Sequence, residues 1–156
     1  MSTVVFYKLD KDYLKKLQTL DSRVSLKNNR AFVGVLITIS QKDYCIPLTS
    51  TIIPESGKKR NSLVTVNVKD RNEEIISCLL INNMIPIKKE ACTRIDFELL
   101  EENNKRYHIE EFIFITKHYE TIEKKANSIY RMRIEGKNPL LNAICCDFEL
   151  LEANIK

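Results

Sequence analysis

Two hydroxyl residues, Thr49 and Ser50, follow an apolar run with the composition of a β-strand, in the stretch YCIPLTSTII (44–53). A basic cluster, GKKR (57–60), comes shortly after them. Hydroxyls at the end of a strand often cap a turn. Together with backbone N–H groups and cations, they can also hydrogen-bond the oxygens of a phosphate group. These residues alone leave both roles open.

Other residues that commonly do chemistry are scarce. The two histidines, His108 and His118, are ten residues apart in a region of helical periodicity, roughly 15 Å along one axis. They cannot share one phosphate on an unbroken helix, although His118 beside Lys117 could act alone as an acid or base, or simply lie on the helix surface. Three glycines cannot build a glycine-rich phosphate loop, and no Cys/His spacing suits zinc. We therefore expect neither a metal nor a cofactor.

The five cysteines are Cys45, Cys78, Cys92, Cys145 and Cys146. Their number is odd and they form no C-x-x-C motif. We expect them to be reduced and mostly buried, with the adjacent pair serving as two small apolar residues.

Length and composition indicate one soluble domain over residues 1–156. A chain of this size buries roughly 70% of its unfolded surface, and 44% hydrophobic with 29% charged residues is ordinary for a globular protein. No apolar run approaches the ~18 residues of a membrane-spanning helix, and the N-terminal apolar stretch is too short for a signal peptide. The expected location is the cytoplasm.

The net charge of +4 is unevenly distributed. Residues 1–31 carry seven Lys/Arg against three Asp, and residues 117–137 carry six against three Glu, whereas residues 90–111 carry three against seven Asp/Glu. Such segregation is compatible with a cationic face that binds a polyphosphate, or with ordinary solvated helix faces.

The apolar pattern changes from period two to helical period along the chain, which predicts an α+β fold with about five or six antiparallel strands followed by helices. Strands are expected at 3–9, 31–39, 44–48, 63–68, 94–99 and once or twice within 75–87. Helices are expected from Asp10, from about 105, from about 120 to a cap at Gly136, and from a cap at Asp147.

Three details of the sequence concern the two strands of the predicted hairpin that ends at Thr49. Residues 31–39 are apolar throughout, which predicts a central strand covered on both faces, and Gly34 within it suggests a bend or a close approach. The turn at 40–43 makes a hairpin with residues 44–48. Pro47 predicts an edge or bulged position for that second strand.

Five sequence blocks follow one another along residues 6–152: FYKLDKDYLKKL, RAFVGVL, DYCIPLTS, INNMIPI and FELLE. In this order they resemble the ToxN/AbiQ family of endoribonuclease toxins of type III toxin–antitoxin systems. The resemblance implies a twisted antiparallel sheet surrounded by helices, related to the Kid/MazF toxins. It also implies metal-independent RNA cleavage, a role in antiviral defence, and neutralisation by a small structured repeat RNA in a protein–RNA hetero-oligomer.

The resemblance gives the hydroxyl pair a role. RNA is cut without metal when its 2′-hydroxyl attacks the adjacent phosphorus, leaving a 2′,3′-cyclic phosphate and a 5′-hydroxyl. Thr49 and Ser50 would then position the phosphate and stabilise its charge, and Arg30 would hold it bidentately.

The sequence departs from the family two residues after the serine, where the family has lysine and this chain has Ile52. The general base and acid therefore stay open among Lys58, Lys59, Glu55 and His118.

RNA contacts are expected from cations at both ends of the chain and in the basic cluster, with aromatic rings stacking on bases. The expected contacts are Lys8, Lys11, Lys15, Arg23, Tyr44, Arg60, Lys124, Arg131 and Arg133. Tyr7 and Phe32 are further stacking candidates, although all three aromatic rings could instead belong to the core. The alternatives to a nuclease are a non-catalytic RNA-binding protein of the same fold and, with less support, a protein-interaction module.

Overall fold

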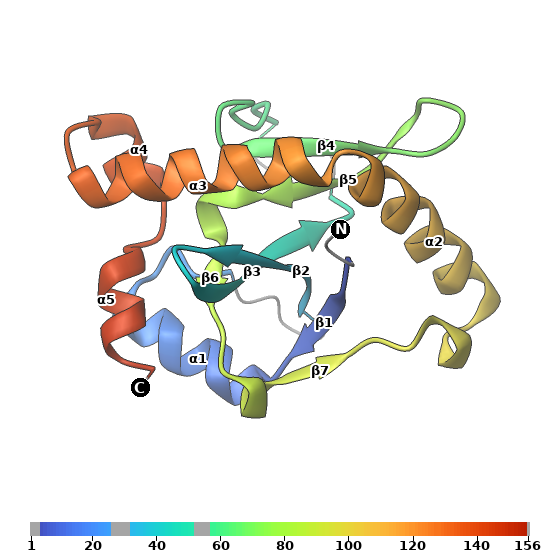
Figure 1. Cartoon of the computed structure of the whole chain (residues 1–156), viewed down its shortest axis with the longest axis horizontal. Helices are drawn as coiled ribbons and strands as arrows, with labels where there is room; N and C mark the ends of the chain where they lie inside the picture. The colour runs from blue at the N-terminus through green and yellow to red at the C-terminus, as the bar shows by residue number, and fades with distance from the viewer. Residues whose placement is uncertain (1–3, 26–31, 52–56, 156) are drawn as a thin grey trace.

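The computed structural model describes residues 4–25, 32–51 and 57–155. A seven-stranded antiparallel sheet has the order β4-β5-β3-β2-β1-β7, with the short β6 also pairing with β3. Helices frame the sheet, with α3 along its upper side, α2 down the right and α1 beside α5 at the lower left (Figure 1). This confirms the predicted α+β class.

The elements follow one another in a strand-rich first half and a helical second half. In chain order they are β1 (Phe6–Leu9), α1 (Lys11–Leu20), β2 (Phe32–Ile39), β3 (Lys42–Thr49), β4 (Thr65–Lys69), β5 (Ile75–Leu80), η1 (Ile81–Asn83), β6 (Ile85–Pro86), η2 (Lys89–Ala91), β7 (Cys92–Arg94), η3 (Phe97–Leu99), α2 (Glu102–Lys117), α3 (Tyr119–Glu135), α4 (Pro139–Ile144) and α5 (Phe148–Ala153).

The β2–β3 hairpin confirms the predicted turn. Ile39 pairs with Lys42, and the two residues between them, Ser40 and Gln41, have φ of 49° and 67°. Two successive positive φ angles are typical of the tight turn whose twist matches that of paired strands. The hairpin therefore sets the register that carries β3 to Thr49.

Gly34 makes the expected close approach. It pairs with Pro47, and a Cβ atom at this position would lie 2.2 Å from the sulfur of Cys45 and 2.8 Å from the carbonyl oxygen of Ile46. Only glycine fits there without displacing the neighbouring strand.

Pro47 lies on an interior strand and pairs with Gly34 in a register that has no shift, so the prediction of an edge or bulged position was wrong. On the side of β3 away from β2, Tyr44 and Cys45 pair with β6, and Leu48 and Thr49 pair with β5. Pro47 lies between these two short pairings. The N–H that proline lacks therefore breaks no described strand pairing on the β5–β6 side of β3.

The expectation that β2 is covered on both faces was also wrong. Val35, Ile37 and Ile39 are buried, whereas Leu36 is half-buried and Thr38 is exposed. Helix α3 packs on β2, so the strand is central by pairing but has one fully buried face.

The segment 94–99 is not the predicted strand. β7 ends at Arg94, and η3 follows because the side chain of Asp96 accepts a hydrogen bond from the backbone N of Glu98. Such a local bond competes with strand pairing. It leaves Leu99 84% exposed instead of buried.

The predicted helices are confirmed. Gly136 ends α3 with φ of 70°, and the side chain of Asp147 caps α5 by accepting from Leu150 N. Asp10 lies at the start of α1 as expected but makes no side-chain cap bond. The short α4, begun by Pro139 with a cap at Asn138, was not predicted.

The core lies between the sheet and the helices. Its helical contributors include Leu14 and Leu17 of α1, Ile122, Ala126 and Ile129 of α3, and Phe148 and Leu151 of α5. All five cysteines are free; four are buried and Cys92 is intermediate, as expected. Among the described helices, none is long and apolar enough to cross a membrane.

Candidate active site

Thr49 and Ser50 stand at the exit of β3, where the strand leaves the sheet. Thr49 is 2% exposed and pairs with Cys78 of β5. Its Oγ1 accepts a hydrogen bond from Thr51 N at 3.1 Å, the turn-stabilising role that the sequence left open. Ser50, next along the chain, is exposed. The exit therefore presents one hydroxyl to solvent beside a second that is held by the turn.

Arg60 brings the basic cluster back to this exit. Its Nη2 donates to the carbonyl oxygen of Thr51 at 2.8 Å. The side chain is half-buried, and its Nε is buried with no hydrogen-bond partner among the described residues. Lys58 and Lys59 precede it and are exposed. A guanidinium and two ammonium groups thus belong to a segment anchored at the hydroxyl pair.

A second cation, from helix α3, bonds the chain at the start of β4. The Nζ of Lys125 donates to the carbonyl oxygens of Ser62 at 2.6 Å and Thr65 at 2.8 Å. Burial lowers the pKa of Lys125. Burial raises the pKa of the Cys78 thiol, partly offset by the nearby charges of Arg60 and Lys125 and by a hydrogen bond with Thr65. Arg60 and Lys125 thus each bond backbone carbonyl oxygens, Arg60 at the exit of β3 and Lys125 at the start of β4.

Sequence reasoning did not single out Lys125. It was counted within the basic segment 117–137, where nothing in its type or spacing separates it from Lys124. Lys124 is exposed, whereas Lys125 is half-buried. Only the hydrogen bonds of Lys125 to Ser62 and Thr65 distinguish the two lysines.

His118 lies in a different cleft. It forms the junction of α2 and α3, and its ring is 4.3 Å from that of Phe114. The cleft, of about 830 Å³, lies between the β4–β5 hairpin and the end of α2, and neither Thr49 nor Ser50 lines it. His108 sits within α2 with its Nδ1 2.6 Å from Glu111 Oε1, so the two histidines are separated along one helix as expected.

Several candidates fall outside the described residues. Arg30, Glu55 and Ile52 do so, as does the side chain of Phe32. The exposed cations expected to contact RNA are Lys8 on β1, Lys11 and Lys15 on α1, and Lys124 and Arg131 on α3.

Arg23 has a structural role, which speaks against its expected phosphate contact. Its Nε lies 2.8 Å from Asp21 Oδ1 and its Nη2 3.1 Å from Oδ2, while Nη1 donates to the carbonyl oxygen of Asn142 at 2.6 Å. Asp21 also accepts from Asp147 N. Burial would raise the pKa of Asp21, but the hydrogen bonds from Arg23 and Asp147 outweigh it and lower that pKa.

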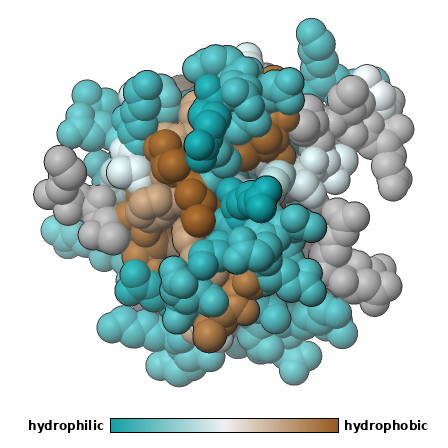
Figure 2. All heavy atoms as spheres, turned by 90° about the vertical axis from the view of Figure 1, so that its right-hand side faces the viewer, coloured by the Kyte–Doolittle hydropathy of each residue, from teal (hydrophilic) through white to brown (hydrophobic). Residues whose placement is uncertain are grey.

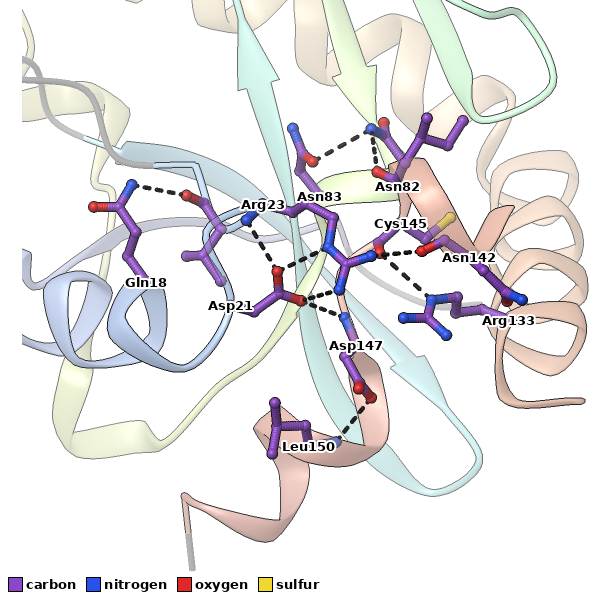
Figure 3. Close-up of polar contacts among 12 residues, drawn as sticks. Gln18, Asp21, Arg23, Asn82, Asn83, Arg133, Asn142, Cys145, Asp147 and Leu150 are labelled. Atoms are coloured by element: carbon purple, nitrogen blue, oxygen red, sulfur yellow. Dashed lines mark hydrogen bonds and ion pairs between the residues drawn. The ribbon is translucent and has the colours of Figure 1, made fainter. Parts of the chain in front are cut away.

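Figure 3 shows this guanidinium between the Asp21 carboxylate and Asn142 of α4. Arg133 bonds the residue just after α4, with Nε donating to the carbonyl oxygen of Cys145 at 3.4 Å. Asn82, in the INN block, donates to the carbonyl oxygen of Ile144 and accepts from Cys146 N through its own backbone oxygen. These contacts tie the C-terminal helices to the sheet.

Tyr44 is wrong as an RNA contact. It is 0% exposed, its hydroxyl donates to Glu152 Oε2, and its ring packs edge-on against Tyr130 and Phe148. A base cannot stack on a ring enclosed in this way. Tyr7, on β1, is half-buried.

A second surface lies on the side of the molecule where α2 runs. Figure 2 shows apolar atoms gathered between polar regions on this face. A cleft of about 640 Å³, lined by residues that include Phe6, Phe97, Phe112 and Arg94, lies between β1 and α2. Phe97 stacks on His108 and meets Phe6 edge-on. The lining of this cleft is suited to apolar contact, whereas the β3 exit combines hydroxyls with cations.

The described residues hold no group of three or more His, Cys, Asp and Glu side chains placed to bind a metal ion. What the β3 exit offers chemically is hydrogen-bond donation and positive charge. That combination suits an oxyanion such as a phosphate.

Comparisons with known proteins agree with the resemblance seen in the sequence. A family model described as toxin ToxN of type III toxin–antitoxin systems matches residues 5–156. Endoribonuclease ToxN of Bacillus thuringiensis subsp. kurstaki is 31% identical over 94% of this chain and 80% of its own length. Endoribonuclease AbiQ of Lactococcus lactis subsp. lactis is 29% identical over 97% of this chain and 87% of its own length.

Solved structures give the same result. A type III toxin, described as selectively inhibited by a non-coding RNA pseudoknot, superimposes with a TM-score of 0.87 at 26% identity, covering 97% of this chain and 95% of the other. The structure of AbiQ, described as a lactococcal anti-phage endoribonuclease, gives 0.84 at 25% identity with the same coverage. On sequence and fold together, the chain belongs to the ToxN family of toxins of type III toxin–antitoxin systems.

Proposed function

We propose that this chain is an endoribonuclease toxin that cleaves single-stranded RNA at the exit of β3 without a metal ion. The observation that carries the proposal is the Arg60 guanidinium bonded to the carbonyl oxygen of Thr51, the residue that follows the exposed Ser50. Two relatives are named endoribonucleases, which supports the same activity here.

In the proposed reaction the 2′-hydroxyl of the RNA attacks the adjacent phosphorus, and the bond from phosphorus to the 5′-oxygen of the next nucleotide breaks. The products are a 2′,3′-cyclic phosphate and a 5′-hydroxyl. The 2′-hydroxyl loses a proton and the leaving 5′-oxygen gains one, so the step needs a base and an acid but no water.

Ser50 and Arg60 stabilise the charge that develops on the phosphate oxygens. A hydroxyl donor and a guanidinium placed before the reaction begins avoid the cost of reorganising solvent. Thr49 holds the turn through Thr51 N, which keeps Ser50 at the strand exit. A serine or threonine hydroxyl is a poor base unaided, so neither residue is the nucleophile.

Lys58 and Lys59 are the proposed proton-transfer candidates, because they are exposed and directly precede Arg60. His118 is less well placed, since the cleft that it lines does not include the hydroxyl pair. The family has a lysine at the sequence position that Ile52 occupies here. In this chain Arg60 supplies the positive charge of that lysine.

The proposed partner is a structured antitoxin RNA. One solved relative is described as inhibited by a non-coding RNA pseudoknot. A groove that accepts substrate RNA accepts an inhibitory RNA by the same phosphate contacts, so the inhibitor would occupy the exit of β3. The exposed cations of β1, α1 and α3 would extend that contact.

The test is cleavage of a mixed single-stranded RNA in EDTA, with analysis of the fragment ends. We expect cyclic phosphate and 5′-hydroxyl ends, and a loss of about 100-fold or more in rate for Ser50→Ala, by analogy with removal of one oxyanion donor. Thr49→Ala should also slow cleavage. Thr38→Ala is the matched control, because Thr38 is an exposed threonine on the neighbouring strand β2.

Fragments with 5′-phosphate ends, or full activity in both hydroxyl variants, would overturn the mechanism. RNA that is bound tightly by the parent but never cut would instead support the second candidate, an RNA-binding protein of the same fold.

A further inference from the structure

Lys125 is the one lysine of α3 with described hydrogen bonds to the β4 region. Its Nζ donates to the carbonyl oxygens of Ser62 and Thr65, at 2.6 and 2.8 Å. An ammonium group loses hydration when it is partly buried, and two carbonyl acceptors offset that loss. These two bonds hold the chain at the start of β4 against helix α3.

The chain between Arg60 and β4 is a tight turn built on Asn61. Asn61 Oδ1 accepts from Leu63 N at 2.9 Å, and its backbone oxygen accepts from Val64 N at 3.1 Å and from Thr65 Oγ1 at 3.0 Å. Lys125 then holds two carbonyl groups of this same turn. Displacing the turn would displace Arg60, the residue immediately before it.

Arg60 connects the turn to the candidate active site. Its Nη2 donates to Thr51 O at 2.8 Å. Thr65, which Lys125 bonds, pairs with Leu80 of β5, two residues from Cys78, the partner of Thr49. The two cations therefore bond neighbouring parts of the same sheet, Arg60 at the exit of β3 and Lys125 at the start of β4.

From these contacts we infer that Lys125 is a positioning residue for RNA cleavage, which acts by holding the 61–65 turn so that Arg60 meets the scissile phosphate at the exit of β3. The inference rests on the proposed function. Lys125 itself bonds the backbone rather than the RNA, so its effect passes through Arg60. A misplacement of about 1 Å at a reacting centre can cost about 100-fold in rate.

The test is the steady-state cleavage of a defined single-stranded RNA by Lys125→Met, Arg60→Met and the double variant. For Lys125→Met we expect kcat to fall about tenfold or more, while KM changes by less than about threefold. Because Lys125 acts through Arg60, the double variant should be no slower than Arg60→Met alone, within about twofold. An independent stabilising role would not produce this non-additivity.

Two further variants complete the design. Lys137→Met is the control for loss of a lysine charge, since Lys137 is exposed just after α3, and it should cleave like the parent. Lys125→Arg retains donors for both carbonyl oxygens and should keep kcat within about fivefold. If Lys125→Met does not fold, Lys125→Gln, which keeps an N–H₂ donor, replaces it in the same cycle.

Parental kcat in Lys125→Met, or losses that multiply in the double variant, would overturn the inference. Those results are distinguishable from failure of the proposed function, because in that case the parent protein itself would leave the RNA intact or its cleavage would not depend on Ser50.

Discussion

Glu152 near the C-terminus is the centre of a polar cluster whose loss should destabilise the fold measurably. Its carboxylate accepts hydrogen bonds from Lys42 Nζ at 2.6 Å, from Tyr130 Oη at 2.7 Å and from the buried Tyr44 hydroxyl. These donors come from β3 and α3, and the acceptor lies on α5. The perturbation is Glu152→Gln, which keeps the size of the side chain and removes its charge.

The magnitude follows from the three bonds. A hydrogen bond to a charged group contributes about 1.5–3 kcal/mol, and an ion pair as exposed as that of Lys42 about 0–1 kcal/mol. Glutamine can still accept from one or two donors through its neutral oxygen, at about half the strength. The net loss in the free energy of unfolding is therefore about 2–3 kcal/mol, or about 4–12 °C in Tm for a chain of this size.

The loss should also depend on pH. Burial would raise the pKa of Glu152, but the bonds from Lys42, Tyr44 and Tyr130 lower it below its ordinary 4.5. A carboxyl whose pKa is lowered on folding contributes stability that is fully present above the ordinary pKa and is lost as the pH falls through the folded value. The difference between parent and variant should therefore be largest near pH 7 and shrink below about pH 4.5.

Urea unfolding followed by far-ultraviolet circular dichroism measures this difference; the chain has no tryptophan to report by fluorescence. Glu149→Gln is the matched control on α5, because Glu149 is exposed, and it should change stability by less than about 0.5 kcal/mol. A Glu152→Gln loss no larger than that control, or one of equal size at pH 7 and pH 3.5, would refute the reasoning.

Three other perturbations follow from the structure. Gly34→Ala places a Cβ atom 2.2 Å from the Cys45 sulfur and should cost about 1–3 kcal/mol of stability by overpacking, visible as a lower Tm. Asp21→Asn removes the charge that pairs with Arg23 and should cost about 2–3 kcal/mol at pH 7; because the pKa of Asp21 is lowered from 3.8, this loss should fade in acid unfolding below that pH. Lys11→Met should reduce the slope of log affinity for single-stranded RNA against log salt by about 0.7 if this exposed lysine contacts a phosphate.

Much of the fold was predictable because its signals are local. The helix that ends at Gly136 has a long apolar stripe and a glycine with positive φ at its end. Asp147 begins the last helix with a side-chain cap. The errors lie where a distant partner or one polar bond decides the structure. Pro47 is tolerated inside the sheet because two short strands, β5 and β6, pair with β3 on either side of it. The chain leaves β7 where the Asp96 side chain bonds Glu98 N, and the apolar periodicity of the sequence gives no sign of such a bond.

Prediction of the site divides in the same way. The hydroxyl pair at the strand exit was predictable, because an apolar run that ends in Thr49 and Ser50 shows where β3 stops. The roles of the cations were not, because a charge count treats every Lys and Arg alike. Arg23 is held by a carboxylate two residues earlier, and Lys125 by two carbonyl groups about sixty residues away.

The contacts of these cations distinguish those that hold the fold together from those that lie near the candidate active site. Arg23 bonds Asn142 of α4 and Arg133 bonds Cys145 just after it, so both guanidinium groups are already used to attach the C-terminal helices. Arg60 and Lys125 instead bond the chain around the exit of β3 and the start of β4, Arg60 through Thr51 O and Lys125 through Ser62 O and Thr65 O. Under the proposed function, the guanidinium of Arg60 is the group at this exit best suited to an RNA phosphate, because a guanidinium matches the charge and the planar geometry of two phosphate oxygens.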